Sequence, residues 1–153
     1  MFIVSTESFS VWKNKQLSKG GDIKSLSLLI DLLGGLSKKD LNLIKIKSEK
    51  NLKLKLDLNH LEYFWNKHLT TSTPIQYLSG ISYWRDLKLE VSNKVLIPRP
   101  ETELIIEIID GIFKKKQEKK TFVDLGTGSG AISIALALAN PSWNGIATDI
   151  DKN

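Results

Sequence analysis

The sequence predicts an α/β protein with a helical first half, a short β-hairpin and a strand–turn–helix–strand unit near its end. Before residue 80, apolar residues recur mainly at helical spacing. Short alternating segments follow Gly80, and a glycine-rich turn stands between two apolar segments near the C-terminus. At 153 residues, the chain has room for one domain, or for a small domain and part of another.

The first half contains start and stop signals for helices. Ser5-Thr6-Glu7 offers a cap for a first helix, and Gly20-Gly21 ends it, because glycine tolerates the left-handed conformation of a C-terminal cap. Asp22 can cap a second helix, which ends at Gly34-Gly35. A third follows a capping-box pattern over Ser37–Asp40, with Asp where Glu or Gln is usual. We expect the second helix to bury a stripe at helical spacing: Leu26, Leu29, Ile30 and Leu33.

The segment Asn51–Leu58 has an ambiguous pattern. Its leucines alternate with polar residues, a period that favours a strand. The neighbouring segments read as helical, however, and a strand needs a partner with which to pair. We therefore expect a loop here, leading into a helix from about Asn59.

After Gly80 the pattern changes to short strands. Tyr83-Trp84 and Leu87–Val91 predict a hairpin joined by the turn Arg85-Asp86, and Val95–Ile97 is a further strand candidate. Pro98-Arg99-Pro100 imposes a rigid extended loop, because proline fixes its own backbone and biases the preceding residue away from helix. The helix that follows is expected to bury a stripe made of Ile105, Ile108, Ile109 and Ile112.

The last segment reads as one βαβ unit. Phe122–Leu125 is a short apolar strand, Gly126–Gly130 is the turn, and Ala131–Ala139 is a helix closed by Asn140-Pro141. A second strand, Gly145–Thr148, ends at Asp149. This order predicts two parallel strands with a right-handed crossover.

The glycine turn and Asp149 predict a site for an adenosine-bearing cofactor. Gly126, Gly128 and Gly130 have no Cβ, so a ligand can approach the main chain closely. The free N–H groups and positive dipole end of the following helix attract an anion. Asp149 follows Gly130 by 19 residues, at the end of the second strand, where its carboxylate can accept both hydroxyls of a ribose.

Asp124 discriminates between two cofactors. The turn also fits the loosened dinucleotide fingerprint, which would hold NAD. Asp124 places a negative charge beside the turn, and this charge would repel a pyrophosphate. S-adenosylmethionine carries an ammonium and a sulfonium besides its carboxylate, so the sequence favours it over NAD. A purely structural interpretation stands beside this one: Asp124 could cap the turn, and Gly130 could serve helix–strand packing.

Three segments stand in one order at family-like spacing: Pro74–Gly80, Leu96–Glu103 and Asp124–Gly130. They resemble the release factor glutamine methyltransferases, and the resemblance covers about residues 74–151. Residues 1–73 match only as a helical, leucine-rich leader. The resemblance implies a helical substrate-recognition domain at 1–78, a β-hairpin connector at 79–98, and the start of a class I, Rossmann-like methyltransferase domain at 99–153.

The resemblance also implies the activity and the site. The family uses S-adenosylmethionine to methylate the side-chain amide nitrogen of a Gln in the Gly-Gly-Gln loop of peptide chain release factors, proteins of translation termination. The residues implied to bind the cofactor are Asp124, Gly126, Thr127, Gly128, Ser129, Gly130 and Asp149. Residues that would border its methionine end are Arg99, Pro100, Glu101 and Thr102. The alternative interpretation of Pro98 and Pro100 is a rigid strand-to-helix corner.

The family's catalytic Asn-Pro-Pro-Tyr motif does not occur in this sequence. We therefore predict no catalytic residue within 1–153 and no turnover by this chain alone, which reads as an N-terminal portion. Two alternatives are the N-terminal portion of a DNA or RNA amino-methyltransferase and a non-catalytic binding module.

Composition excludes several other classes. The absence of Cys excludes thiol catalysis and is compatible with a reducing cytosol. His60 and His68 lack a metal-ligand spacing, so we predict no metal site. We also expect no membrane segment, no signal peptide, no direct nucleic-acid contact, a monomer and a cytoplasmic location. The charged run Lys114–Lys120 reads as a solvated connection.

Overall fold

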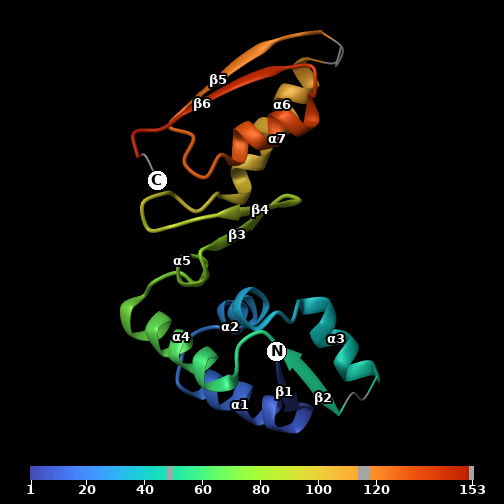
Figure 1. Ribbon diagram of the computed structural model, residues 1–153, viewed down its shortest axis with the longest axis vertical. Helices are drawn as coiled ribbons and strands as arrows, with labels where there is room; N and C mark the ends of the chain where they lie inside the picture. Colours follow the sequence, from blue (N-terminus) through green and yellow to red (C-terminus); the bar gives the residue numbers. More distant parts are fainter. Residues whose placement is uncertain (48–49, 114–117, 152–153) are drawn as a thin grey trace. The chain divides into compact units, whose positions relative to one another are not determined.

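The computed structural model describes residues 1–47, 50–113 and 118–151 and divides the chain into two compact units. The first unit is Met1–Ser79, and the second is Gly80–Asn153 (Figure 1). Helices and strands occur in both units, so the protein is of mixed α/β class. Part of the charged run, residues 114–117, lies outside the described residues.

The first unit combines helices with one small antiparallel sheet. The helical elements are α1 (Thr6–Ser18), α2 (Ile23–Leu29), the π-helical turn η1 (Ile30–Gly34), α3 (Lys38–Lys47), α4 (Leu58–Thr71) and α5 (Ile75–Ser79). The strands are β1 (Phe2–Ser5) and β2 (Asn51–Leu54).

The predicted helix caps are confirmed. The Ser5 hydroxyl accepts a hydrogen bond from the Ser8 amide at 3.0 Å, and the Asp22 carboxylate accepts from the Lys24 and Ser25 amides. Ser37 and Asp40 form a reciprocal capping box, in which each side chain accepts from the other residue's main-chain N–H. The Ser25 hydroxyl also donates to Asp22, and the Ser37 hydroxyl donates to Asp40. These two hydroxyl bonds, followed by the main-chain bonds, lower the pKa of Asp22 and of Asp40.

The expected loop at Asn51–Leu58 is wrong. Residues Asn51–Leu54 form β2, which pairs antiparallel with β1 in a register that sets Val4 opposite Leu52. Leu52 and Leu54 are buried, as the alternating pattern indicated. The partner strand lies far away in sequence, at the N-terminus of the unit, so local patterning could not reveal it. Helix α4 then begins at Leu58, where the Asp57 carboxylate accepts from the His60 amide.

The prediction of a buried stripe on the second helix is confirmed up to Ile30 and is wrong after it. Leu26, Leu29 and Ile30 are fully buried, but the next buried leucine is Leu32 and not Leu33. The π-helical turn η1 explains the change, because its wider turn shifts the side chains that follow. Gly35 then ends the helix in the left-handed conformation, as predicted.

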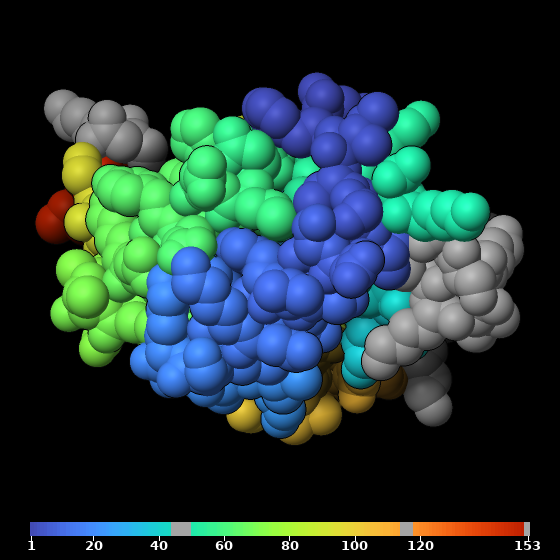
Figure 2. Space-filling view, turned by 90° about the horizontal axis from the view of Figure 1, so that it is seen from below, coloured from blue at the N-terminus to red at the C-terminus, as the bar shows by residue number. Residues whose placement is uncertain are grey.

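Trp65 of α4 is the largest fully buried side chain of the first unit that the structure describes. It is fully buried, and its indole N–H donates to the main-chain carbonyl of Gln16 in α1 at 3.0 Å. Glu62, one turn earlier, accepts from the Gln16 side chain and pairs with Lys19, which lowers its pKa. Helices α1 and α4 therefore lie side by side, as Figures 1 and 2 both show.

The second unit begins with a hairpin and ends with a parallel strand pair. Its elements are β3 (Ile81–Trp84), β4 (Leu87–Glu90), the 3₁₀ turn η2 (Pro100–Thr102), α6 (Glu103–Ile112), β5 (Thr121–Leu125), α7 (Ala131–Ala139) and β6 (Asn144–Thr148). The hairpin and the βαβ order are confirmed. The strand expected at Val95–Ile97 is wrong: this segment belongs to an irregular loop. In Figure 1, α6 and α7 lie together on one side of the β5–β6 sheet.

The buried face of α6 differs from the predicted stripe. Ile106 is 1% exposed and packs with Trp84 and α7, whereas Ile108 and Ile112 are 50% and 66% exposed. Ile105 is also exposed, and Ile109 is half-buried beside the core. Because isoleucines surround much of this helix, periodicity alone could not select the face that packs.

Adjacent glycines in the first unit offer a stability test. A Cβ on Gly21 would lie 2.7 Å from the Trp65 ring, whereas one on Gly20 would meet nothing within 4 Å. Both residues have positive φ, so alanine strains the backbone at each position. We expect Gly21→Ala to lose about 1–3 kcal/mol more unfolding free energy than Gly20→Ala in urea denaturation. Equal losses would show that the Trp65 contact does not limit this turn.

Candidate functional site

The parallel pairing of β5 with β6 positions the glycine turn. The register sets Asp124 opposite Ala147 and Leu125 opposite Thr148. The ladder then continues into the turn, because the Gly126 and Thr127 amides both donate to the Thr148 carbonyl, at 2.8 and 3.0 Å. Carboxyl ends of parallel strands meet at one edge of a sheet, so Asp149 is placed beside the turn.

The three glycines of the turn adopt conformations that other residues avoid. Gly126, Gly128 and Gly130 have φ of 75°, 55° and 77°, all in the left-handed region. A Cβ on Gly126 or Gly128 would meet nothing within 4 Å, so their main chain borders open space. On Gly130 it would come 3.3 Å from the Ile134 side chain, which supports a packing role for that glycine besides any ligand role.

Asp149 is joined to the turn directly. The Gly128 amide donates to its Oδ2 at 2.7 Å, and the Asp151 amide donates to Oδ1 at 3.1 Å. These main-chain hydrogen bonds, that of Gly128 foremost, lower the pKa of Asp149. The carboxylate is exposed apart from these contacts. It can therefore still accept hydrogen bonds from hydroxyl groups of a ligand.

Asp124 lies at the other flank of the turn and is held by two hydroxyl groups. Its Oδ2 accepts from Thr127 Oγ1 at 2.8 Å and from Ser133 Oγ at 2.6 Å. Among the described residues, side-chain hydroxyls thus hold Asp124 to the turn, and the Gly126 and Thr127 amides donate to the Thr148 carbonyl rather than to Asp124. Sequence reasoning did not select Ser133. The only available signal was a hydroxyl residue in the first turn of the helix after the glycines.

The helix α7 begins without a side-chain cap. Its N-cap is Gly130, which carries no side chain that could accept from the first amides. The Gly130 amide itself donates to the Thr127 carbonyl. The first turn of α7, which holds Ser133 against Asp124, therefore presents main-chain N–H donors without a side-chain cap. This is an arrangement of donors and acceptors that suits a zwitterionic ligand.

The segment Arg99–Thr102 forms a corner between the hairpin and α6. The Arg99 carbonyl accepts from the Trp84 indole N–H at 2.9 Å and from the Thr102 amide at 3.1 Å. Pro100, Glu101 and Thr102 make up the single turn η2. Among the described residues, no hydrogen bond joins this segment to the glycine turn. Its predicted place at a cofactor's methionine end stays a prediction.

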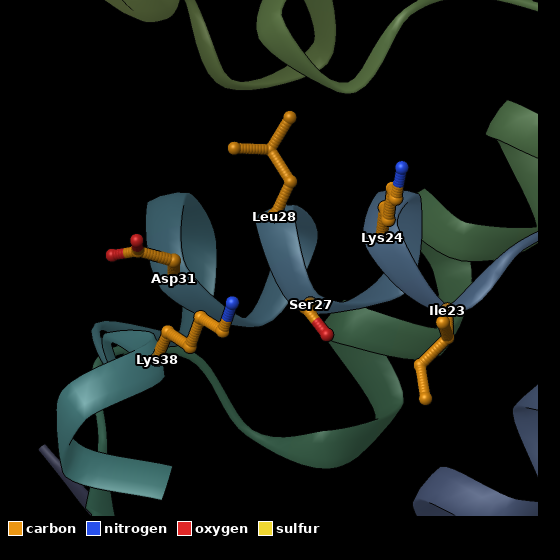
Figure 3. Close-up of a pocket in the computed structure, with 6 residues that line it drawn as sticks. All are labelled: Ile23, Lys24, Ser27, Leu28, Asp31 and Lys38. Atoms are coloured by element: carbon orange, nitrogen blue, oxygen red, sulfur yellow. The ribbon is translucent and has the colours of Figure 1, made fainter. Parts of the chain in front are cut away.

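The first unit contains a separate surface hollow of about 430 Å³. Its lining residues are Ile23, Lys24, Ser27, Leu28, Asp31 and Lys38. Burial, followed by the nearby Asp40 charge, raises the pKa of Asp31. Figure 3 shows Lys24 and Leu28 on one side of α2 and Ile23 on the other, so these side chains do not converge on one point. The glycine turn is the better candidate site.

The remaining sequence candidates have structural partners. His60 Nδ1 lies 3.0 Å from the Asp57 carboxylate at the start of α4, and His68 Nδ1 lies 2.8 Å from the Thr73 carbonyl. Residues 1–47, 50–113 and 118–151 contain no group of three His, Cys, Asp or Glu side chains that could hold a metal ion. No helix that the structure describes has both the length and the apolar character needed to cross a membrane.

Comparison with known proteins confirms the predicted resemblance. The chain is 41% identical over 146 residues to the release factor glutamine methyltransferase of Prochlorococcus marinus. It is 37% identical over 120 residues to the enzyme of that name in Thermosynechococcus vestitus, and 42% over 113 residues to that in Lactococcus lactis. These matches cover 95%, 78% and 73% of the chain. No family model matches.

The chain spans half or less of the length of these curated relatives. The matched part is 50% of the Prochlorococcus protein, 40% of the Thermosynechococcus protein and 38% of the Lactococcus protein. The chain is thus a relative of the release factor glutamine methyltransferases over a part of their sequence.

The hydrogen bond between Gly128 and Asp149 predicts a pH dependence. Because the bond favours the ionised carboxylate, it contributes stability above the ordinary Asp pKa of 3.8. That contribution is lost as the pH falls through the lower pKa of the folded state. In an NMR titration, we expect the Asp149 carboxyl carbon and the Gly128 amide proton to share a midpoint below 3.8. In Asp149→Asn the Gly128 shift should lose this titration. A midpoint at or above 3.8 would contradict the contact.

Proposed function

We propose that this chain provides the helical unit and the first half of the cofactor site of an S-adenosylmethionine-dependent methyltransferase. In this proposal the acceptor is the side-chain amide nitrogen of a Gln in a peptide chain release factor. The observation that carries it is the glycine turn between Asp124 and Asp149, in a chain whose relatives have the name release factor glutamine methyltransferase.

The residues of the turn fit this cofactor. Its ammonium needs an acceptor, which Asp124 offers, and its carboxylate needs donors, which the uncapped first turn of α7 offers. The ribose hydroxyls need acceptors, and Asp149 is exposed beside the turn. The open space over Gly126 and Gly128 lets the main chain approach a ligand. A pyrophosphate would meet the charge of Asp124 instead, and this argues against NAD.

When bound, S-adenosylmethionine supplies an electrophilic methyl group: its S–CH₃ bond breaks as a new N–CH₃ bond forms, the sulfur keeps the electron pair, and the amide nitrogen gives up a proton. The residues of this chain bind and orient. Asp124 and the α7 amides hold the amino-acid end, and Asp149 holds the ribose. No residue of 1–153 is assigned to position the acceptor amide or to take its proton.

The uncovered face of the sheet supports a larger domain of Rossmann type. Helices α6 and α7 lie on one side of β5 and β6. On the strands, Val123, Leu125 and Ile146 are 57%, 79% and 53% exposed. Parallel sheets are found almost only with both faces covered, so these apolar residues require further structure against them. We infer that they form the inner face of a doubly wound sheet.

Isothermal titration tests the cofactor. We expect heat of binding with S-adenosylmethionine and none with NAD under the same conditions. Asp149→Ala should weaken S-adenosylmethionine binding about 10- to 100-fold, because a carboxylate hydrogen bond to each ribose hydroxyl is lost. Glu101→Ala removes a carboxylate from the segment predicted to border the methionine end. It is compared with Glu7→Ala, a control in the first unit that should leave the affinity for S-adenosylmethionine unchanged. Binding of NAD but not of S-adenosylmethionine would reject the proposal.

Methyl transfer tests the acceptor. A release factor with the sequence Gly-Gly-Gln and its Gln→Ala variant are incubated with labelled S-adenosylmethionine and a protein that joins this chain to the remaining half of a curated relative. Label on the first substrate alone is the expected result. Label on DNA or RNA instead would favour a nucleic-acid amino-methyltransferase, and the chain without its second half should transfer none.

A further inference from the structure

Ser133 is a side chain beside the glycine turn to which the proposed function assigns no task. It lies in the first turn of α7, and its hydroxyl donates to Asp124 Oδ2 at 2.6 Å. Thr127 Oγ1 donates to the same oxygen at 2.8 Å, and the two hydroxyl oxygens lie 3.3 Å apart. One carboxylate oxygen of Asp124 thus accepts hydrogen bonds from both hydroxyl groups.

This arrangement fixes the orientation of the Asp124 carboxylate. Two donors on one oxygen, one from the turn and one from the helix, restrict rotation of the carboxylate plane. Both bonds go to Oδ2, and within the described residues no hydrogen bond to Oδ1 accompanies them. Oδ1 therefore keeps its full capacity to accept from a ligand. Without Ser133, the Thr127 hydroxyl of the turn would be left as the one side-chain donor described for this carboxylate.

We propose that Ser133 is a positioning residue for the amino-acid end of the cofactor. By holding Asp124 Oδ2, it directs Oδ1 toward the ammonium of the bound methionine moiety. This inference rests on the proposed function, because it needs a ligand with an ammonium group. It goes beyond that function by assigning a ligand-specific role to a residue that does not itself touch the ligand.

If Ser133 acts through the amino-acid end of the cofactor, its removal should lower the affinity only for ligands that have this end. 5′-Methylthioadenosine has the adenosine and thioether of the cofactor but no amino-acid end. Ser133→Ala should therefore weaken S-adenosylmethionine binding about five- to tenfold, because Asp124 keeps its charge but loses one of the two hydroxyl groups that orient it, and should leave 5′-methylthioadenosine binding unchanged. Asp149→Ala should weaken both ligands, because both contain the ribose.

Two further variants separate this role from a structural one. Ser133→Thr keeps the hydroxyl and should restore S-adenosylmethionine affinity to within about twofold of the original chain. Ser10→Ala removes another helical serine hydroxyl, one that donates to the Thr6 carbonyl in the first unit, and should change neither affinity. Because alanine favours helix, Ser133→Ala is expected to fold, and thermal unfolding of each variant checks this.

The outcomes distinguish the inference from the proposed function. If the unaltered chain binds 5′-methylthioadenosine and S-adenosylmethionine but Ser133→Ala weakens both equally, or neither, the inference is overturned and the proposed function stands. If the unaltered chain binds neither ligand, the proposed function fails at its first step. Selective loss of S-adenosylmethionine, with rescue by Ser133→Thr, supports the inference.

Discussion

The parallel pairing of β5 with β6 is the constraint on which the candidate site depends. Main-chain donation from Gly126 and Thr127 to the Thr148 carbonyl carries the ladder past the last strand residues. This brings the turn to the strand that precedes Asp149, whose carboxylate then accepts from Gly128. A shift of one residue in this register would separate the two, since side chains alternate along a strand. The acidic flanks of the turn are therefore consequences of backbone pairing.

The second unit pairs a well-packed side with an uncovered one. Trp84, Ile106 and two alanines of α7, Ala131 and Ala135, belong to one buried cluster. The opposite face carries exposed Val123 and Leu125, and α6 exposes Ile108 and Ile112. These exposed apolar surfaces, on two elements of one unit, are the observation behind the larger domain that we propose.

Helices whose ends are marked by capping residues were predictable from the sequence, and elements that depend on distant partners were not. Ser5, Asp22 and the Ser37–Asp40 box cap their helices because a cap needs only neighbouring residues. The strand at Asn51–Leu54 was mistaken for a loop because its partner is the N-terminal strand. Periodicity also failed at the π-helical turn, where Leu32 is buried in place of the predicted Leu33. It failed again at α6, because isoleucines lie on several sides of this helix and do not identify its buried face.

The sequence by itself determined the chemical types at the site: glycines that accept left-handed backbone, and acidic residues before and after them. It also determined the family resemblance, because each of the three motifs is a continuous run of residues that can be recognised without the fold. Only the tertiary structure decided that Ser133 meets Asp124 and that Gly128 donates to Asp149. The reason is physical: these contacts join residues on different elements, and their distances are set by strand register and helix packing.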